Sequence, residues 1–145
     1  MEAFGLHLTL DGYNCNYQKI TDLDLIYSFL DEGPDIIGMT KIMPPYVFKY
    51  SGKVPEDWGL SGFVLIAESH ISIHTFPEKT YLSLDIFSCK LFDTLKITDY
   101  IKNLFNIGHY ESNLLDRGLE FPRNPKTVEE ILTKERGKMV VGGLK

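Results

Sequence analysis

Three apolar stretches follow one another closely in the middle of the chain, and their spacing constrains the fold more than any other feature. Residues 60–67 are apolar and β-branched, residues 71–76 alternate between apolar and polar, and residues 81–89 alternate again. Each pattern is typical of a β-strand. The break around Ser69 and the turn at residues 77–80 are too short for the crossover that parallel strands require. The sequence therefore predicts a run of antiparallel strands.

The remainder of the chain predicts two helices and further strands. Apolar side chains recur at helical spacing in residues 21–30, where Gly33-Pro34 is expected to end the helix, and in residues 93–105. Further strands are expected at residues 5–11, 36–43 and 109–120, a loop at 46–59 and a weak helix at 127–134. These elements predict an α+β fold, a two-layer sandwich with a largely antiparallel sheet and two helices on one face.

The size of the chain limits its organisation. A chain of 145 residues and 16.6 kDa fits one domain, because a split would leave two poor cores. We expect residues 1–123 to form that domain and residues 124–145 to form a C-terminal tail. Two cysteines, Cys15 and Cys89, cannot make a disulfide framework and are expected to remain thiols.

Charge and hydropathy exclude several classes of function. The formal net charge is −5 with no long basic run, which argues against a nucleic-acid partner. No apolar stretch approaches the roughly 20 residues of a membrane helix, and the N-terminus lacks the features of a signal peptide. The histidines and cysteines do not have zinc-ligand spacing, so no metal site is expected. These observations predict a cytoplasmic protein without a membrane anchor.

Polar and reactive side chains are concentrated where the most apolar strand ends, in residues 67–78. Strand ends on a rigid scaffold are common positions for reactive groups. Taken singly, each residue has an ordinary structural explanation. Ser69 is explained as a turn residue, His74 as a partly buried histidine, and Cys89 as a small core side chain. The carboxylates Glu68 and Glu78 are explained as solvated loop residues.

Taken together, these residues form a long and specific pattern. Residues 68–78 read Glu-Ser-His-Ile-Ser-Ile-His-Thr-Phe-Pro-Glu, and residues 84–89 read Leu-Asp-Ile-Phe-Ser-Cys. This pattern closely resembles the signature of the prokaryotic S-adenosylmethionine decarboxylase family. The match continues upstream through residues 59–62, and it reaches the N-terminus through Gly5, His7, Asp11 and Cys15. The resemblance covers roughly residues 4–120.

The resemblance implies that the chain cuts itself at the Glu68-Ser69 bond, giving a β chain of residues 1–68 and an α chain of residues 69–145. The Ser69 hydroxyl would attack the Glu68 carbonyl carbon, an intramolecular reaction favoured by proximity. Loss of the Ser69 α-proton and hydrolysis would then leave a pyruvoyl group at the new N-terminus. This self-derived cofactor would form a Schiff base with the substrate amine and accept the electrons released by decarboxylation.

The resemblance also implies roles for three further residues. His74 matches the proton acceptor of the processing reaction, for which a neutral imidazole is suited near pH 7. Ser61 matches a serine that assists processing, with an expected hydrogen bond to the intermediate oxygen. Cys89 matches the proton donor of the decarboxylation, and an ordinary thiol is mostly protonated at neutral pH.

Substrate contacts follow from the same resemblance. Phe76 matches an aromatic residue beside the nucleoside, Glu78 matches a carboxylate that holds the ribose hydroxyls, and Asp11 is a further acidic contact. The family resemblance also implies a homodimer with composite active sites between protomers. The expected small-molecule substrate is S-adenosylmethionine, decarboxylated for spermidine synthesis.

One segment departs from the family pattern. Residues 41–57 are several residues longer than is usual before Gly59, in the region that supplies a second aromatic plate for the adenine. Aromatic candidates for that plate are Tyr46, Phe48 and Trp58. Because the longer loop carries Glu56 and Asp57, the same pyruvoyl chemistry on arginine or ornithine is an alternative. A non-processing homologue with a structural or regulatory role is another.

Overall fold

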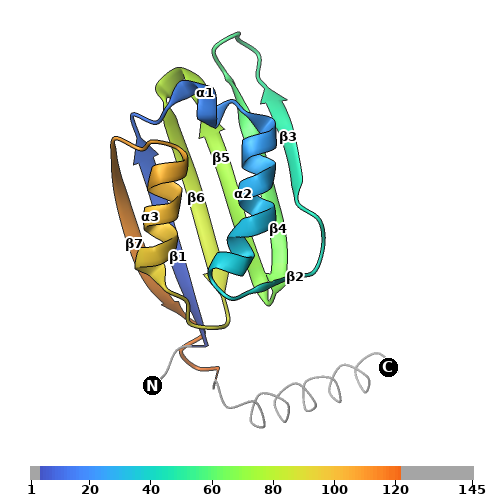
Figure 1. The fold of residues 1–145 in the computed structure, drawn as a ribbon, viewed down its shortest axis with the longest axis vertical. Coiled ribbons are helices and arrows are strands. Elements are labelled where there is room, and N and C mark those ends of the chain that lie inside the picture. The colour runs from blue at the N-terminus through green and yellow to red at the C-terminus, as the bar shows by residue number, and fades with distance from the viewer. Residues whose placement is uncertain (1–3, 122–145) are drawn as a thin grey trace, which may run out of the picture.

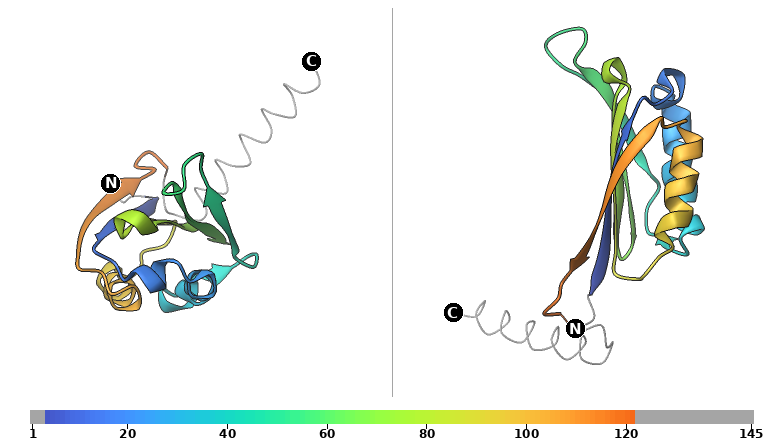
Figure 2. Two further views of the ribbon diagram at one scale, coloured as in Figure 1. Left: turned by 90° about the horizontal axis from the view of Figure 1, so that it is seen from above. Right: turned by 90° about the vertical axis from the view of Figure 1, so that its left-hand side faces the viewer.

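The computed structural model describes residues 4–121, and the predicted helix at 127–134 lies outside them. One sheet carries helices on one of its faces, as Figures 1 and 2 show. The strands are β1 (Gly5–Tyr13), β2 (Thr40–Lys41), β3 (Tyr46–Ser51), β4 (Trp58–Ala67), β5 (Ser69–Phe76), β6 (Tyr81–Ser88) and β7 (His109–Arg117). The helices are α1 (Tyr17–Ile20), α2 (Leu23–Ile36) and α3 (Thr94–Leu104), with a 3-10 turn, η1 (Pro77–Lys79). The predicted α+β two-layer sandwich is confirmed.

Every pair of neighbouring strands in the described sheet is antiparallel. The order is β2-β4-β5-β6-β1-β7, and β3 pairs with β4 farther along the edge occupied by β2. The adjacent strands β4, β5 and β6 are the three predicted from the central apolar stretches. Short hairpin connections thus place β5 near the middle of the sheet, where both of its edges are hydrogen-bonded.

The helices cover one face of the sheet because each has one apolar side. α2 and α3 run along that face, and α1 lies at one end (Figure 1). Side-chain caps define their first turns, since Asp22 accepts a hydrogen bond from Leu25 N and Asp93 accepts one from Lys96 N. Fully buried side chains from the helices and the sheet form the shared core, among them Phe29, Phe105, Ile71, Ile73, Leu82 and Leu84. The two predicted helices on one face are confirmed, and α1 is an addition.

Three local predictions were wrong. α2 continues through Gly33 and Pro34 to Ile36, so the predicted strand at 36–43 is reduced to β2. Gly33 and Pro34 are buried against the sheet, and this packing outweighs their low helix propensity. The Pro34 carbonyl accepts hydrogen bonds from Ile37 N and Met39 N, which end the helix one turn later than predicted. The predicted loop at 46–59 contains β3, whose pairing with β4 the proline and glycine residues around it obscured.

The opposite face of the sheet carries no helix among residues 4–121 (Figure 2). We call it the open face. Side chains that alternate with the core residues point toward it. One cross-strand row on this face follows the register from β4 through β7 and contains Leu65, His70, Phe87, His7 and Leu115. Leu65 and Leu115 are 39% and 49% exposed. The open face therefore combines exposed apolar side chains with titratable ones.

Candidate active site

The hairpin between β4 and β5 carries the bond that the sequence predicts to be cut. Ile66 and Ser69 are the last paired residues, so Ala67 and Glu68 form a two-residue loop. The Ala67–Glu68 peptide bond is cis. Ser69 has a φ of 112°, in a region that L side chains rarely adopt, so its backbone is strained. The bond predicted to be cut thus lies between the exposed Glu68 and a serine with a strained backbone.

Cys89 follows β6 and lies against both sides of the Glu68-Ser69 bond. Its Sγ lies 3.5 Å from Ser69 Oγ and 3.8 Å from Glu68 Oε2. Its backbone N–H donates to the Glu68 carbonyl oxygen at 3.4 Å. That oxygen gains negative charge when the carbonyl carbon is attacked, so the N–H is aligned to stabilise it. The structure therefore brings Glu68, Ser69 and Cys89 together.

Ser61 and His74 meet at the other end of the same hairpin. They are directly opposite in the β4–β5 register, and Ser61 Oγ lies 2.9 Å from His74 Nδ1. This contact orients the imidazole and leaves Nε2 for another partner. Alternation along β4 and β5 directs the side chains of Ser61 and His74, respectively, toward the open face. The two predicted processing residues therefore form one unit.

Within one chain, the Ser61–His74 pair lies far from Ser69 and Cys89. His74 lies five residues beyond Ser69 on β5, which corresponds to about 16 Å at roughly 3.3 Å per residue. A proton acceptor must lie within hydrogen-bonding reach of its proton, about 3 Å. Within a single protomer, the His74 imidazole is therefore too far from the Ser69 α-carbon to serve it.

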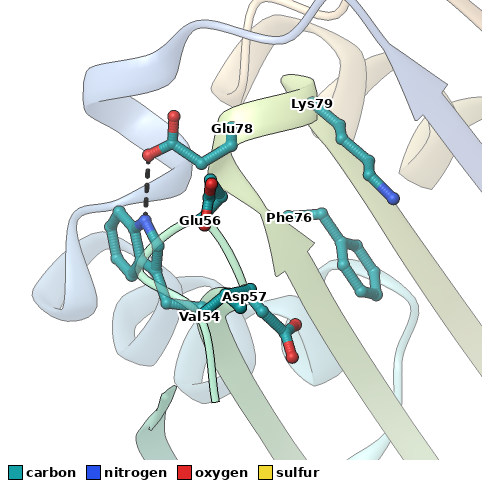
Figure 3. Close-up of a pocket in the computed structure, with 7 residues that line it drawn as sticks. Val54, Glu56, Asp57, Phe76, Glu78 and Lys79 are labelled. Atoms are coloured by element: carbon teal, nitrogen blue, oxygen red, sulfur yellow. Dashed lines mark hydrogen bonds between the residues drawn. The ribbon is translucent and has the colours of Figure 1, made fainter. Parts of the chain in front are cut away.

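Two of the three predicted substrate contacts, Phe76 and Glu78, line a pocket beyond the end of β5, whereas Asp11 lies outside it (Figure 3). The pocket measures about 320 Å³ and is lined by Val54, Glu56, Asp57, Trp58, Phe76, Glu78 and Lys79. A neighbouring pocket of about 180 Å³ is lined in part by Trp58, Ser61, His74 and Phe76. Of the three aromatic candidates in the longer segment, only Trp58 lines both cavities. The two pockets connect the Ser61–His74 pair with the predicted nucleoside contacts Phe76 and Glu78.

Asp11 lies on the same cross-strand row as Ser61 and His74, through Ser83 of β6. Its Oδ1 accepts a 2.6 Å hydrogen bond from the Tyr81 hydroxyl. Burial, followed by this hydrogen bond, raises the pKa of Tyr81 to about 12. The phenol therefore remains a donor at neutral pH. Sequence reasoning missed Tyr81, because strand pairing between residues 70 positions apart brings it to Asp11.

The two thiols have different surroundings. Cys15 is 5% exposed, and burial raises the pKa of its thiol to about 11. Cys89 is half-buried beside the cleavage site. Reactivity depends on the thiolate and on access to it, which makes Cys15 a core side chain. Neither cysteine is in a disulfide, as predicted.

Residues 4–121 contain no cluster of three or more metal-ligating side chains. None of the helices in that part of the chain is long and apolar enough to cross a membrane.

Comparison with known proteins agrees with this site. The family model for S-adenosylmethionine decarboxylase matches residues 6–118. An S-adenosylmethionine decarboxylase proenzyme from Pyrococcus furiosus is 34% identical over 143 residues, covering 94% of this chain and 99% of that protein. One from Clostridium botulinum is 38% identical over 103 residues, covering 70% and 84%. The crystal structure of the adenosylmethionine decarboxylase from Aquifex aeolicus superimposes with a TM-score of 0.66 at 30% identity, covering 82% of this chain and 94% of that one. The chain belongs to the S-adenosylmethionine decarboxylase family.

Proposed function

We propose that this chain is a self-processing S-adenosylmethionine decarboxylase that supplies decarboxylated substrate for spermidine synthesis. Cleavage at Glu68-Ser69 gives chains of residues 1–68 and 69–145, and the domain of residues 1–123 spans both. The observation that carries the proposal is the arrangement at that bond. Ser69 has a strained backbone, its hydroxyl lies 3.5 Å from the Cys89 thiol, and the Cys89 N–H donates to the Glu68 carbonyl.

Cleavage begins when Ser69 Oγ attacks the Glu68 carbonyl carbon and the amide becomes an ester. The strained Ser69 backbone favours this reaction, because breaking the peptide bond releases the constraint on φ. The Cys89 N–H stabilises the oxygen that becomes negative. His74 then removes the Ser69 α-proton, and the Glu68 carboxylate leaves as the ester bond breaks, which converts residue 69 to dehydroalanine. Hydrolysis of the dehydroalanine releases ammonia and leaves the pyruvoyl group.

In the processed enzyme the pyruvoyl group derived from Ser69 supplies the electron sink for decarboxylation. Cys89 donates the proton that the product requires, from a thiol that lies 3.5 Å from Ser69 Oγ in the uncleaved chain. Phe76 provides an aromatic face and Glu78 a carboxylate beside the larger pocket. These two residues bind the nucleoside part of the substrate. Asp11, whose carboxylate accepts a hydrogen bond from the Tyr81 hydroxyl, provides a further acidic contact on the open face.

The active site is composite and belongs to a homodimer. The separation of about 16 Å along β5 supports this proposal, since His74 of one protomer is out of reach of its own Ser69. A two-fold axis perpendicular to β5 reverses the strand, and the Ser69 end of one copy then faces the His74 end of the other. The apolar side chains Leu65, Phe87 and Leu115 on the open face support burial of that face in the dimer.

Intact mass followed by a substrate panel tests the proposal. Wild-type protein should give two fragments, residues 1–68 and 69–145, and release carbon dioxide from S-adenosylmethionine. Ser69→Ala should remain one chain, and Cys89→Ala should be impaired in decarboxylation after it is cleaved. A full-length wild-type mass under all conditions would support the structural or regulatory homologue. Release of carbon dioxide from arginine or ornithine, and not from S-adenosylmethionine, would show that the basic amino acid is the substrate.

A further inference from the structure

Trp58 contacts the carboxylate that is proposed to hold the substrate ribose. Its indole Nε1 donates to Glu78 Oε1 at 3.0 Å, as the dashed line in Figure 3 marks. Trp58 is the first residue of β4, and Glu78 lies in η1 after β5. The Lys49 ammonium lies 4.9 Å from the centre of the indole ring. These contacts hold the ring by its edge and by one of its faces.

The hydrogen bond restricts a side chain that otherwise has several rotamers. Glu78 is exposed, and the terminal torsion of a glutamate is broad and has no strong preference. The indole N–H is only a donor, whereas a carboxylate has about four acceptor positions. Anchoring Oε1 therefore fixes the plane of the carboxylate and leaves Oε2 to accept from a ligand. The Phe76 ring lines the same pocket and supplies an apolar surface for the ligand (Figure 3).

An oriented carboxylate suits one kind of ligand better than another. Attraction of an ammonium group depends on charge and distance and needs no particular carboxylate plane. A hydrogen bond from the indole even withdraws charge from Oε1. Two neighbouring hydroxyl groups instead donate hydrogen bonds in a fixed geometry. They bind more tightly to acceptors that are already aligned, because less conformational entropy is lost on binding. The Trp58–Glu78 pair therefore favours a vicinal diol over an ammonium group.

We infer that Trp58 is a positioning residue that aligns the Glu78 carboxylate for the vicinal diol of a nucleoside substrate. The inference rests on the proposed function and adds a determinant of substrate class directly after the segment, residues 41–57, that departs from the family pattern. Trp58 acts through Glu78, so its removal weakens substrate binding and leaves both self-cleavage and the chemical step intact.

A double-mutant cycle with Trp58→Phe and Glu78→Ala tests this role. Trp58→Phe keeps an aromatic ring and removes the donor, so the KM for S-adenosylmethionine should rise by roughly threefold to tenfold, while kcat stays within about twofold. In the Glu78→Ala background, which lacks the acceptor of the indole N–H, the same Trp58→Phe change should have little further effect on KM. Tyr27→Phe, which removes a hydroxyl from an exposed side chain of α2 outside both pockets, is the matched control and should leave KM unchanged.

The possible outcomes distinguish failure of the positioning role from failure of the proposed function. Intact mass of every variant first verifies processing. An unchanged KM in Trp58→Phe, or an equal rise in KM in both backgrounds, overturns the positioning role alone. If Glu78→Ala does not fold, an S-adenosylmethionine analogue that lacks the ribose 2′-hydroxyl replaces it. The penalty for that analogue should be smaller in Trp58→Phe than in wild type. Wild-type protein that is not cleaved, or that releases no carbon dioxide from S-adenosylmethionine, overturns both proposals.

Discussion

Combining two inactive variants tests whether His74 of one chain serves Ser69 of another. Ser69→Ala lacks the nucleophile and His74→Ala lacks the proton acceptor, so neither should be cleaved when expressed alone. In a mixed dimer, however, Ser69 of the His74→Ala chain faces His74 of the Ser69→Ala chain. That dimer contains one intact site and one doubly defective site.

The expected extent of cleavage follows from the geometry. His74 is five residues from its own Ser69, about 16 Å along the extended strand, so restoration cannot occur within one chain. Equal co-expression and random pairing make about half of the dimers mixed, and about half of the His74→Ala chains should then be cleaved. Ser69→Ala chains should remain intact. Intact mass distinguishes the two chains and measures both fractions.

A reciprocal mixture provides the control. When wild type is co-expressed with the Ser69→Ala/His74→Ala double variant, every mixed dimer contains two defective sites. Only about half of the wild-type chains should then be cleaved. Full cleavage of wild type in this mixture, together with no cleavage in the first, would refute the composite site and place the whole reaction within one chain.

Three further results are expected from the structure. Gly59→Ala should lower the free energy of unfolding by about 2 kcal/mol or more, because the new Cβ would overlap a carbonyl oxygen of β5. In thermal or denaturant unfolding, Gly33→Ala is its control, since there the nearest atom would be 3.6 Å away. Iodoacetamide at pH 8 should label Cys89, on fragment 69–145, well before Cys15, whose pKa burial raises to about 11; equal labelling of both fragments would contradict this. Burial lowers the pKa of His70 below its ordinary 6.5. The folded protein therefore loses stability as the pH falls from 6.5 through the lowered pKa. Between pH 7.5 and 5, the melting temperature of His70→Gln should fall less than that of the wild type.

The acid sensitivity of His70 has several contributors on the open face. After burial, the positive charges of His7 and Arg117 lower its pKa further, while Asp85 opposes them. His7 Nε2 is buried without a hydrogen-bond partner among the described residues, and it lies 3.7 Å from Asp85 Oδ1. Protonation therefore adds charge to a face that already contains a cationic side chain. A parallel test of dimer content at both pH values would separate unfolding from dissociation.

Much of the fold could be predicted from local patterns. Alternation in residues 5–11, 71–76 and 81–89 predicts strands because the side-chain period of a strand is two, and all three are present. Prediction failed where Pro and Gly suggested an end. Pro34 lies within α2 because its burial against the sheet outweighs its propensity, and β3 forms because β4 offers an edge to pair with. Such contacts depend on distant parts of the chain.

For the candidate site, the sequence by itself determined which chemistry-bearing residues are present, and the motif from Glu68 to Glu78 was sufficient to identify the family. Only the tertiary structure decided how they are grouped. Strand register separates Ser69 and Cys89 from Ser61 and His74, although all four belong to one motif and its flanks. Pairing also joins Trp58 to Glu78, twenty residues away, which no local pattern indicates. The physical reason is that extension along a strand sets distances within a motif, whereas contacts across the sheet depend on which strands pair and in which register.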